Sequence, residues 1–194
     1  MNVETKDVDL VGEEAALNLA RAALFAALVG AGAYVSFPNP FAPGVPVTLQ
    51  VLAVFLTGIF LGPVWGGASM GLYIAAGAAG APVFAGGAAG PGTLVGPTAG
   101  YIWAFPVAAV VLGSVVHGGL ELREPGDAGL SRLVGGMVLA TAIVYGGGVL
   151  GGMAVTGVGP VAAVETYAAA FVPAETSKIA AAVGIVRSDA IRAS

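Results

Sequence analysis

Apolar residues fill most of this chain and occur in runs long enough to cross a lipid bilayer. The clearest runs span 17–37, 98–117 and 131–150. Each is close to the ~20 residues that a helix needs to cross a hydrocarbon core of about 30 Å. The pattern therefore predicts a helical membrane protein.

The region 46–80 allows either one long span or two short spans that meet at LGPVWGG, where Pro63 interrupts a helix. Basic residues decide between the two. Lys6 and Arg21 flank the start of the first span, and Arg123 and Arg132 flank a later loop. Because Lys and Arg gather in cytoplasmic loops, an even number of crossings should separate these two groups. Two short spans in 46–80 give that even number.

The tail also allows two interpretations. A single helix over 161–187 would carry Pro173 in its middle and place Glu175 and Lys178 at the bilayer centre, where a lone charge costs about 2.5–3.5 kcal/mol. A last span that starts at Pro173 and ends near residue 192 instead places the proline in the first turn, where it is tolerated. We predict this second arrangement, with 159–171 as a short interfacial or re-entrant helix.

Together these segments predict an all-α integral membrane protein with six transmembrane helices, both termini in the cytoplasm and a ligand site at the outer side. The outer loops, 38–47, 80–97 and 151–172, contain no Lys or Arg, which supports this orientation. Residues 1–16 are expected to be an acidic cytoplasmic tail and 17–194 a single transmembrane domain. The expected location is the cell membrane, with multiple passes.

Composition supports this class and limits the chemistry. Charged residues make up 9% of the chain and hydrophobic residues 57%, whereas a soluble domain carries roughly 25% charged residues. The absence of Cys excludes disulfides and thiolate chemistry. His117, the one histidine, is expected to be a solvated loop residue rather than a catalyst. We expect no metal, no cofactor and no nucleic-acid partner.

Glu175 and Lys178 are unusual in so apolar a chain. Their spacing of three residues places them on one helix face. They are either a helix-end ion pair, with Lys178 reaching to the membrane interface, or part of a ligand site, since ionisable residues inside a membrane usually face a cavity. A carboxylate that accepts N–H groups beside a cation suits a small ligand that carries both kinds of group.

Further candidates gather at the same outer end. The Gly-rich loop 81–101 lets backbone approach a ligand closely, and the Pro-rich segment 39–50 suits a lid. Thr98, Thr48 and Gln50 stand at predicted helix starts, where they act either as caps or as ligand contacts. Four aromatic residues form either an interfacial belt or a stacking wall: Phe84, Tyr101, Trp103 and Tyr167.

Small residues recur at four-residue spacing in the first span. One stripe holds Ala23, Ala27 and Ala31, and its neighbour holds Ala22, Ala26 and Gly30. Small side chains let helices approach each other closely. These stripes therefore either pack inside the bundle or dock an external partner.

Several motifs in order resemble a known family. The segment 45–105 contains PVTLQ, LGPVWGG, GAAGAPVF and GPTAGY, and FVPAETSKIAAA follows at 171–182. These elements are similar to those of the BioY family, the biotin-binding subunits of energy-coupling factor transporters. The resemblance covers the chain from about residue 20 to 187. Glu175 stands where the family has aspartate, and Lys178 stands at its lysine.

The resemblance implies a six-helix membrane subunit that binds biotin at its outer side. It also implies docking to a transmembrane coupling subunit and to two cytoplasmic ATPase subunits. No Walker motif occurs in this chain, so ATP hydrolysis is expected from the partners and the chain itself is not an enzyme. The expected ligand contacts are Gln50, Phe84, Thr98, Gly100, Tyr101, Glu175 and Lys178, and the expected docking stripe is Ala23, Ala27 and Ala31.

The expected function is high-affinity biotin uptake. In detail, Lys178 is expected to neutralise the ligand carboxylate, and Glu175 to accept a hydrogen bond from the ureido ring. One alternative is the same scaffold binding another vitamin or a biotin precursor. Others are a membrane-embedded enzyme, for which the chain lacks catalytic residues, and a scaffold without a small ligand.

Overall fold

The computed structural model describes residues 11–42 and 45–188, and in these it is almost entirely helical. The helices are α1 (Val11–Gly32), α2 (Gln50–Ala78), α3 (Ala99–His117), α4 (Leu130–Thr156), α5 (Pro160–Tyr167) and α6 (Val172–Arg187). Two-residue strands β1 (Ser36–Phe37) and β2 (Val47–Thr48) pair antiparallel, and the four 3-10 turns are η1 (Ala85–Gly87), η2 (Pro91–Val95), η3 (Pro125–Asp127) and η4 (Ala169–Phe171).

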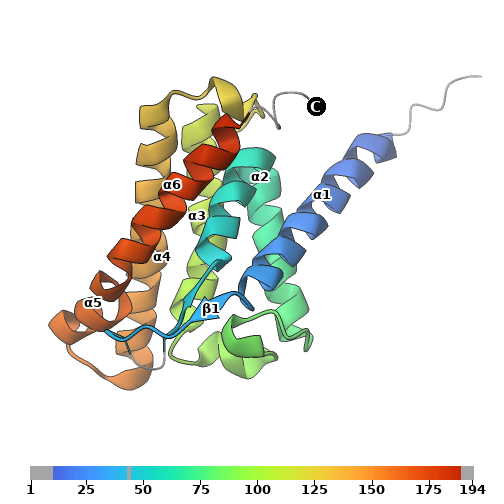
Figure 1. The fold of residues 1–194 in the computed structure, drawn as a ribbon. Coiled ribbons are helices and arrows are strands. Elements are labelled where there is room, and N and C mark those ends of the chain that lie inside the picture. The colour runs from blue at the N-terminus through green and yellow to red at the C-terminus, as the bar shows by residue number, and fades with distance from the viewer. Residues whose placement is uncertain (1–10, 43–44, 189–194) are drawn as a thin grey trace, which may run out of the picture.

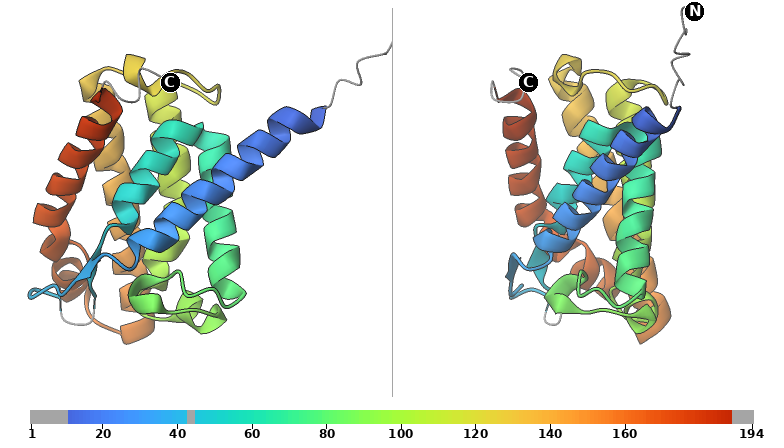
Figure 2. Two further views of the ribbon diagram at one scale, coloured as in Figure 1. Left: turned by 45° about the vertical axis from the view of Figure 1, so that its right-hand side comes forward. Right: turned by 90° about the vertical axis from the view of Figure 1, so that its right-hand side faces the viewer.

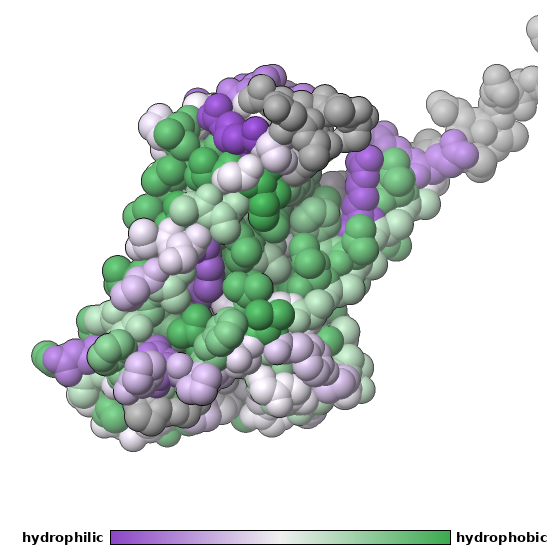
Figure 3. All heavy atoms as spheres, viewed as in Figure 1, coloured by the Kyte–Doolittle hydropathy of each residue, from purple (hydrophilic) through white to green (hydrophobic). Residues whose placement is uncertain are grey.

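The long helices form one bundle, with the strands, η1, η2 and α5 together at one end, which we call the strand end (Figure 1). Five helical stretches of the described chain are long and apolar enough to cross a membrane, when Pro160–Arg187 is counted as one. Hydrophobic atoms dominate the middle of the surface seen in Figure 3, and most hydrophilic atoms lie toward its two ends. The predicted all-α membrane class is confirmed.

Helix α2 is broken in its middle, as LGPVWGG predicts. Gly62 has φ 68°, outside the helical region, and Pro63 follows it. The two legs of α2 lie side by side in both Figure 1 and Figure 2. They approach closely because both contribute glycine at the contact: a Cβ on Gly66 would lie 3.4 Å from the Cα of Gly58.

His117 is buried at the tip of this α2 hairpin, so the prediction of a solvated histidine is wrong. Only 1% of the residue is exposed. Its Nδ1 accepts the backbone N–H of Arg123 at 3.0 Å, which leaves Nε2 as the donor to the carbonyl oxygen of Ile59 at 2.9 Å. In a regular helix that carbonyl would receive the N–H of residue 63, which is proline and has none. The imidazole replaces the missing donor.

Helix α1 starts and ends about five residues earlier than the predicted span 17–37. Its N-terminal end therefore falls inside the segment predicted as a tail, of which residues 1–10 lie outside the described chain. At Gly32 the helix reaches the start of α2, where a Cβ would lie 3.1 Å from the backbone N of Gln50. The helix leans away from the bundle toward its N-terminus (Figure 2). It is fixed at Ala22, whose carbonyl accepts the hydroxyl of Ser69 at 2.8 Å.

The C-terminal region divides where Pro173 predicts. Helix α5 ends at Tyr167, and Ala168 leaves the helical region at φ −136° and ψ −64°. Helix α6 then starts at Val172, with Pro173 in its first turn. The helix ends at Arg187, because Ser188 is extended. The predicted extent to 192 is therefore wrong, and its last residues lie outside the described chain.

Candidate functional site

A largely apolar cavity of about 530 Å³, open mouth included, lies at the strand end of the bundle. Three helix starts converge there, those of α2, α3 and α6, and β2 borders them. The lining residues are Val45, Pro46, Thr48, Gln50, Val51, Ala85, Thr98, Tyr101, Ile102, Phe105, Tyr145, Phe171 and Lys178.

The Glu175–Lys178 pair is buried beside this cavity. Lys178 Nζ lies 2.5 Å from Glu175 Oε1, and the two residues are 5% and 3% exposed. Lys178 is therefore enclosed by the protein instead of extending outward from the helix end. Glu175 Oε2 is buried and has no hydrogen-bond partner among the described residues. Because the pair lies on the first two turns of α6, the break before Val172 sets its position.

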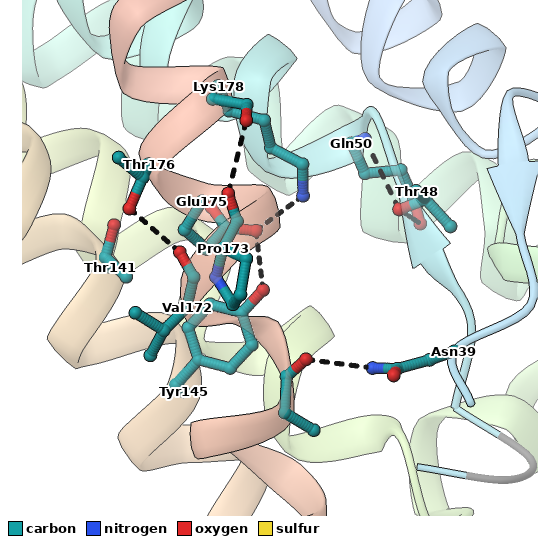
Figure 4. A network of polar contacts seen from close by, with 12 residues as sticks. Asn39, Thr48, Gln50, Thr141, Tyr145, Val172, Pro173, Glu175, Thr176 and Lys178 are labelled. Atoms are coloured by element: carbon teal, nitrogen blue, oxygen red, sulfur yellow. Dashed lines mark hydrogen bonds and ion pairs between the residues drawn. The ribbon is translucent and has the colours of Figure 1, made fainter. Parts of the chain in front are cut away.

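Tyr145 of α4 completes the polar group, and the sequence did not reveal it. Its hydroxyl donates to Glu175 Oε1 at 2.6 Å, so that one carboxylate oxygen accepts from both the phenol and the ammonium (Figure 4). A buried polar group needs such partners, because leaving it unsatisfied costs about 1–3 kcal/mol. The available signal was weak: Gly148 and Gly152 follow Tyr145 on the same face of α4.

Aromatic rings form one wall of the cavity. The ring centroid of Tyr145 lies 5.7 Å from that of Tyr101 and 5.3 Å from that of Phe171. The Tyr101 hydroxyl donates to the backbone carbonyl of Tyr167 at 2.6 Å. Gly148 makes room for the Tyr101 ring, because a Cβ at this position would collide with it. In the described residues this arrangement favours the stacking wall for Tyr101. Trp103 is exposed, and its Nε1 donates to the carbonyl oxygen of Leu94.

The predicted ligand contacts do not all reach the cavity. Gln50, Thr98, Tyr101 and Lys178 line it, whereas Glu175, Phe84 and Gly100 are not among the described lining residues. Phe84 is fully buried, with its ring centroid 5.5 Å from that of Tyr73. Gly100 lies against the backbone of Gly147, where a side chain would not fit. In the structure Phe84 packs against α2 and Gly100 against α4, and their contact with a ligand stays a prediction.

Of the three residues interpreted as helix caps, Thr48 alone accepts a backbone N–H at a helix start in the described residues. Thr98 occupies the N-cap position of α3 but makes no side-chain cap hydrogen bond. Gln50 instead donates through Nε2 to the Tyr73 hydroxyl at 2.7 Å. Thr48 Oγ1 accepts the backbone N–H of Gln50 at 3.4 Å.

No group of three or more His, Cys, Asp or Glu that could hold a metal occurs in residues 11–42 and 45–188.

A helical membrane bundle with a buried ion pair beside an apolar cavity defines a class, the membrane proteins that bind a small molecule. The BioY family model matches residues 4–193. The chain therefore belongs to the BioY family, and the resemblance drawn from the motifs is confirmed.

Individual relatives agree with this assignment. The chain is 44% identical over 95 residues to a biotin transporter BioY of Thermotoga maritima, which covers 49% of this chain and 54% of the relative. It is 38% identical over 134 residues to a biotin transporter BioY of Rhodobacter capsulatus, which covers 69% of this chain and 68% of the relative. With the first of these, and with a probable biotin transporter BioY of Pyrococcus horikoshii, the chain aligns over about half the relative's length.

A solved structure shares the fold. The crystal structure at 2.1 Å of the S-component for biotin from an ECF-type ABC transporter matches with a TM-score of 0.81 and 21% identity, and the match covers 95% of both chains. At this identity the likeness shows the fold alone.

Proposed function

We propose that this chain is the membrane-embedded biotin-binding subunit of an energy-coupling factor transporter and serves biotin uptake. The observation that carries the proposal is the buried Glu175–Lys178 pair at the wall of an apolar cavity. Burying two charges costs free energy even when they are paired. Ionisable residues inside a membrane protein therefore usually mark a functional site. Biotin combines an apolar ring and chain with a ureido group and a carboxylate, and the cavity combines a largely apolar lining with hydrogen-bonding side chains.

The proposal includes six crossings with both termini in the cytoplasm. The two legs of α2 count as separate crossings in this arrangement. Helix α1 starts and α6 ends at the same end of the bundle, opposite the strand end (Figure 2). Arg123, Arg132 and Arg187 belong to that end, where the positive-inside rule places the cytoplasm. The cavity then opens to the outside.

The partners in this proposal are a transmembrane coupling subunit and two cytoplasmic ATPase subunits. The chain itself carries no Walker motif, so ATP hydrolysis belongs to the partners. Binding and energy supply are then separate, and the isolated chain binds biotin without turnover.

Lys178 is the proposed partner of the biotin carboxylate. It uses one N–H on Glu175 and has three in all, so two remain for a ligand. Lys178→Met removes the charge and keeps an apolar stem of similar length. A charge-assisted hydrogen bond contributes about 1.5–3 kcal/mol, so biotin should bind tenfold or more weakly. Biotin amide, which has no carboxylate, should lose much less.

The measurement is a titration of purified protein with each ligand, and Glu175→Gln is the comparison. In this proposal Glu175 contributes to the recognition of the ureido N–H groups, and the ureido ring is common to both ligands. Glu175→Gln should therefore weaken biotin and its amide alike. Equal losses of the two ligands on Lys178→Met would contradict the assignment of the carboxylate. Failure of the unaltered protein to bind at micromolar biotin would reject biotin as the ligand.

A further inference from the structure

Tyr145 is placed between the ion pair and the cavity. The residue is 7% exposed and lines the cavity, whereas Glu175 is not among the described lining residues. Its ring is fixed against Tyr101 and Phe171. The hydroxyl group is therefore held in one position, at the surface that a ligand meets.

The proton of this hydroxyl has a fixed direction. An ionised carboxylate can only accept hydrogen bonds, so in the 2.6 Å contact Tyr145 donates and Glu175 Oε1 accepts. The hydroxyl proton of Tyr145 therefore points at Glu175 and is not available to a ligand. The lone pairs of Tyr145 Oη remain, and within the described residues no donor is directed at them.

The Glu175 carboxylate also makes Tyr145 Oη a stronger hydrogen-bond acceptor. Hydrogen bonds in a chain polarise one another where the local dielectric is low. A phenol that donates to a buried carboxylate therefore becomes a stronger acceptor. Lys178, at 2.5 Å from the same Oε1, holds the carboxylate in place.

We propose that Tyr145 Oη accepts a ureido N–H of the ligand and that Glu175 is a positioning residue that acts through Tyr145. The inference rests on the proposed function and refines it, because the spacing of Glu175 and Lys178 alone suggested direct contact between Glu175 and the ring. The cavity wall then offers a donor, Lys178, and an acceptor, Tyr145, side by side. A ligand that uses both needs an acceptor for Lys178 and an N–H group for Tyr145.

Tyr145→Phe tests the proposal, since it removes one oxygen and keeps the ring. The ligands are biotin, biotin amide and two biotin derivatives methylated on one or the other ureido nitrogen. Tyr145→Phe should weaken biotin and its amide alike, by about tenfold, which corresponds to about 1.4 kcal/mol. The unaltered protein should prefer biotin over at least one methylated derivative. Tyr145→Phe should reduce that preference, which a merely structural role would not change.

Tyr167→Phe is the matched control. Tyr167 is also buried near the wall, but it is not among the described lining residues. Its variant should bind all ligands as the unaltered protein does. Thermal unfolding of the ligand-free proteins in detergent shows whether each variant is folded.

The outcomes separate the two proposals. If the unaltered protein binds no biotin, both are wrong. If it binds biotin and Tyr145→Phe binds equally well with its preference intact, this inference alone is wrong. Glu175→Gln made in the Tyr145→Phe background should add little to the loss of biotin amide, because residues that act together are not additive. A full additional loss would show that Glu175 contacts the ring directly.

Discussion

At the scale of single residues, glycine determines where the aromatic wall stands. Gly148 of α4 lies under the ring of Tyr101, where any Cβ would overlap a ring atom. The Tyr101 ring in turn contacts Tyr145, which holds Glu175. The geometry of the polar group therefore depends on a position that has no side chain.

Gly148→Ala should displace the Tyr101 ring toward the cavity. Overpacking of this kind costs typically about 1–3 kcal/mol, so both the Tm of the protein and its biotin affinity should fall. Gly146→Ala is the control on the same helix, because its Cβ meets nothing within 4 Å. That change should leave binding unaltered. Isothermal titration and thermal unfolding measure both, and equal behaviour of the two variants would contradict the role of Gly148.

At the scale of elements, proline made the helix breaks predictable. Pro63 and Pro173 each marked a boundary that the structure has, at Gly62 and before Val172. Hydropathy located the spans but not their ends. Helix α1 ends at Gly32, where the start of α2 is packed against it, and a single run of apolar residues carries no information on that contact.

The polar groups of the site were only partly predictable for the same reason. Glu175 and Lys178 are conspicuous in an apolar run and three residues apart, so local spacing reveals them. Tyr145 is 30 residues from its partner Glu175. His117 meets a carbonyl 58 residues earlier. Such pairs form only when helices pack against each other, and the local sequence pattern does not predict which residues then meet.

His117 provides a test of the α2 hairpin. His117→Ala leaves the Ile59 carbonyl and the Arg123 N–H without their partner, and each unsatisfied buried group costs about 1–3 kcal/mol. The Tm in detergent should therefore fall clearly. His117→Gln keeps a donor that can serve Ile59 and should lose less. Because the site lies at the other end of the bundle, biotin affinity of the folded fraction should stay unchanged. An Ala variant as stable as the unaltered protein would show that the hairpin needs no such donor.

At the scale of the whole molecule, α1 is the least buried of the five helical stretches of the described chain that could cross a membrane. Its buried stripe, Ala22 and Ala26, packs against α2, whereas Ala23, Ala27 and Ala31 are exposed. Small residues on an exposed face let another helix approach closely, and lipid alone does not require them. The cavity lies at the strand end among α2, α3, α4 and α6. The cavity and the exposed stripe of α1 are thus separate surfaces of the molecule.

We predict that α1 docks the coupling subunit through Ala23, Ala27 and Ala31. Ala27→Leu places a bulky side chain in the middle of this stripe and should abolish co-purification with the coupling subunit and the ATPases. Biotin affinity should stay within about twofold, which is less than about 0.5 kcal/mol, because the stripe is not among the described lining residues of the cavity. Ala142→Leu, on an exposed position of α4, is the control and should retain association. If Ala27→Leu instead destroys biotin binding, the stripe is internal packing and α1 does not provide the docking surface.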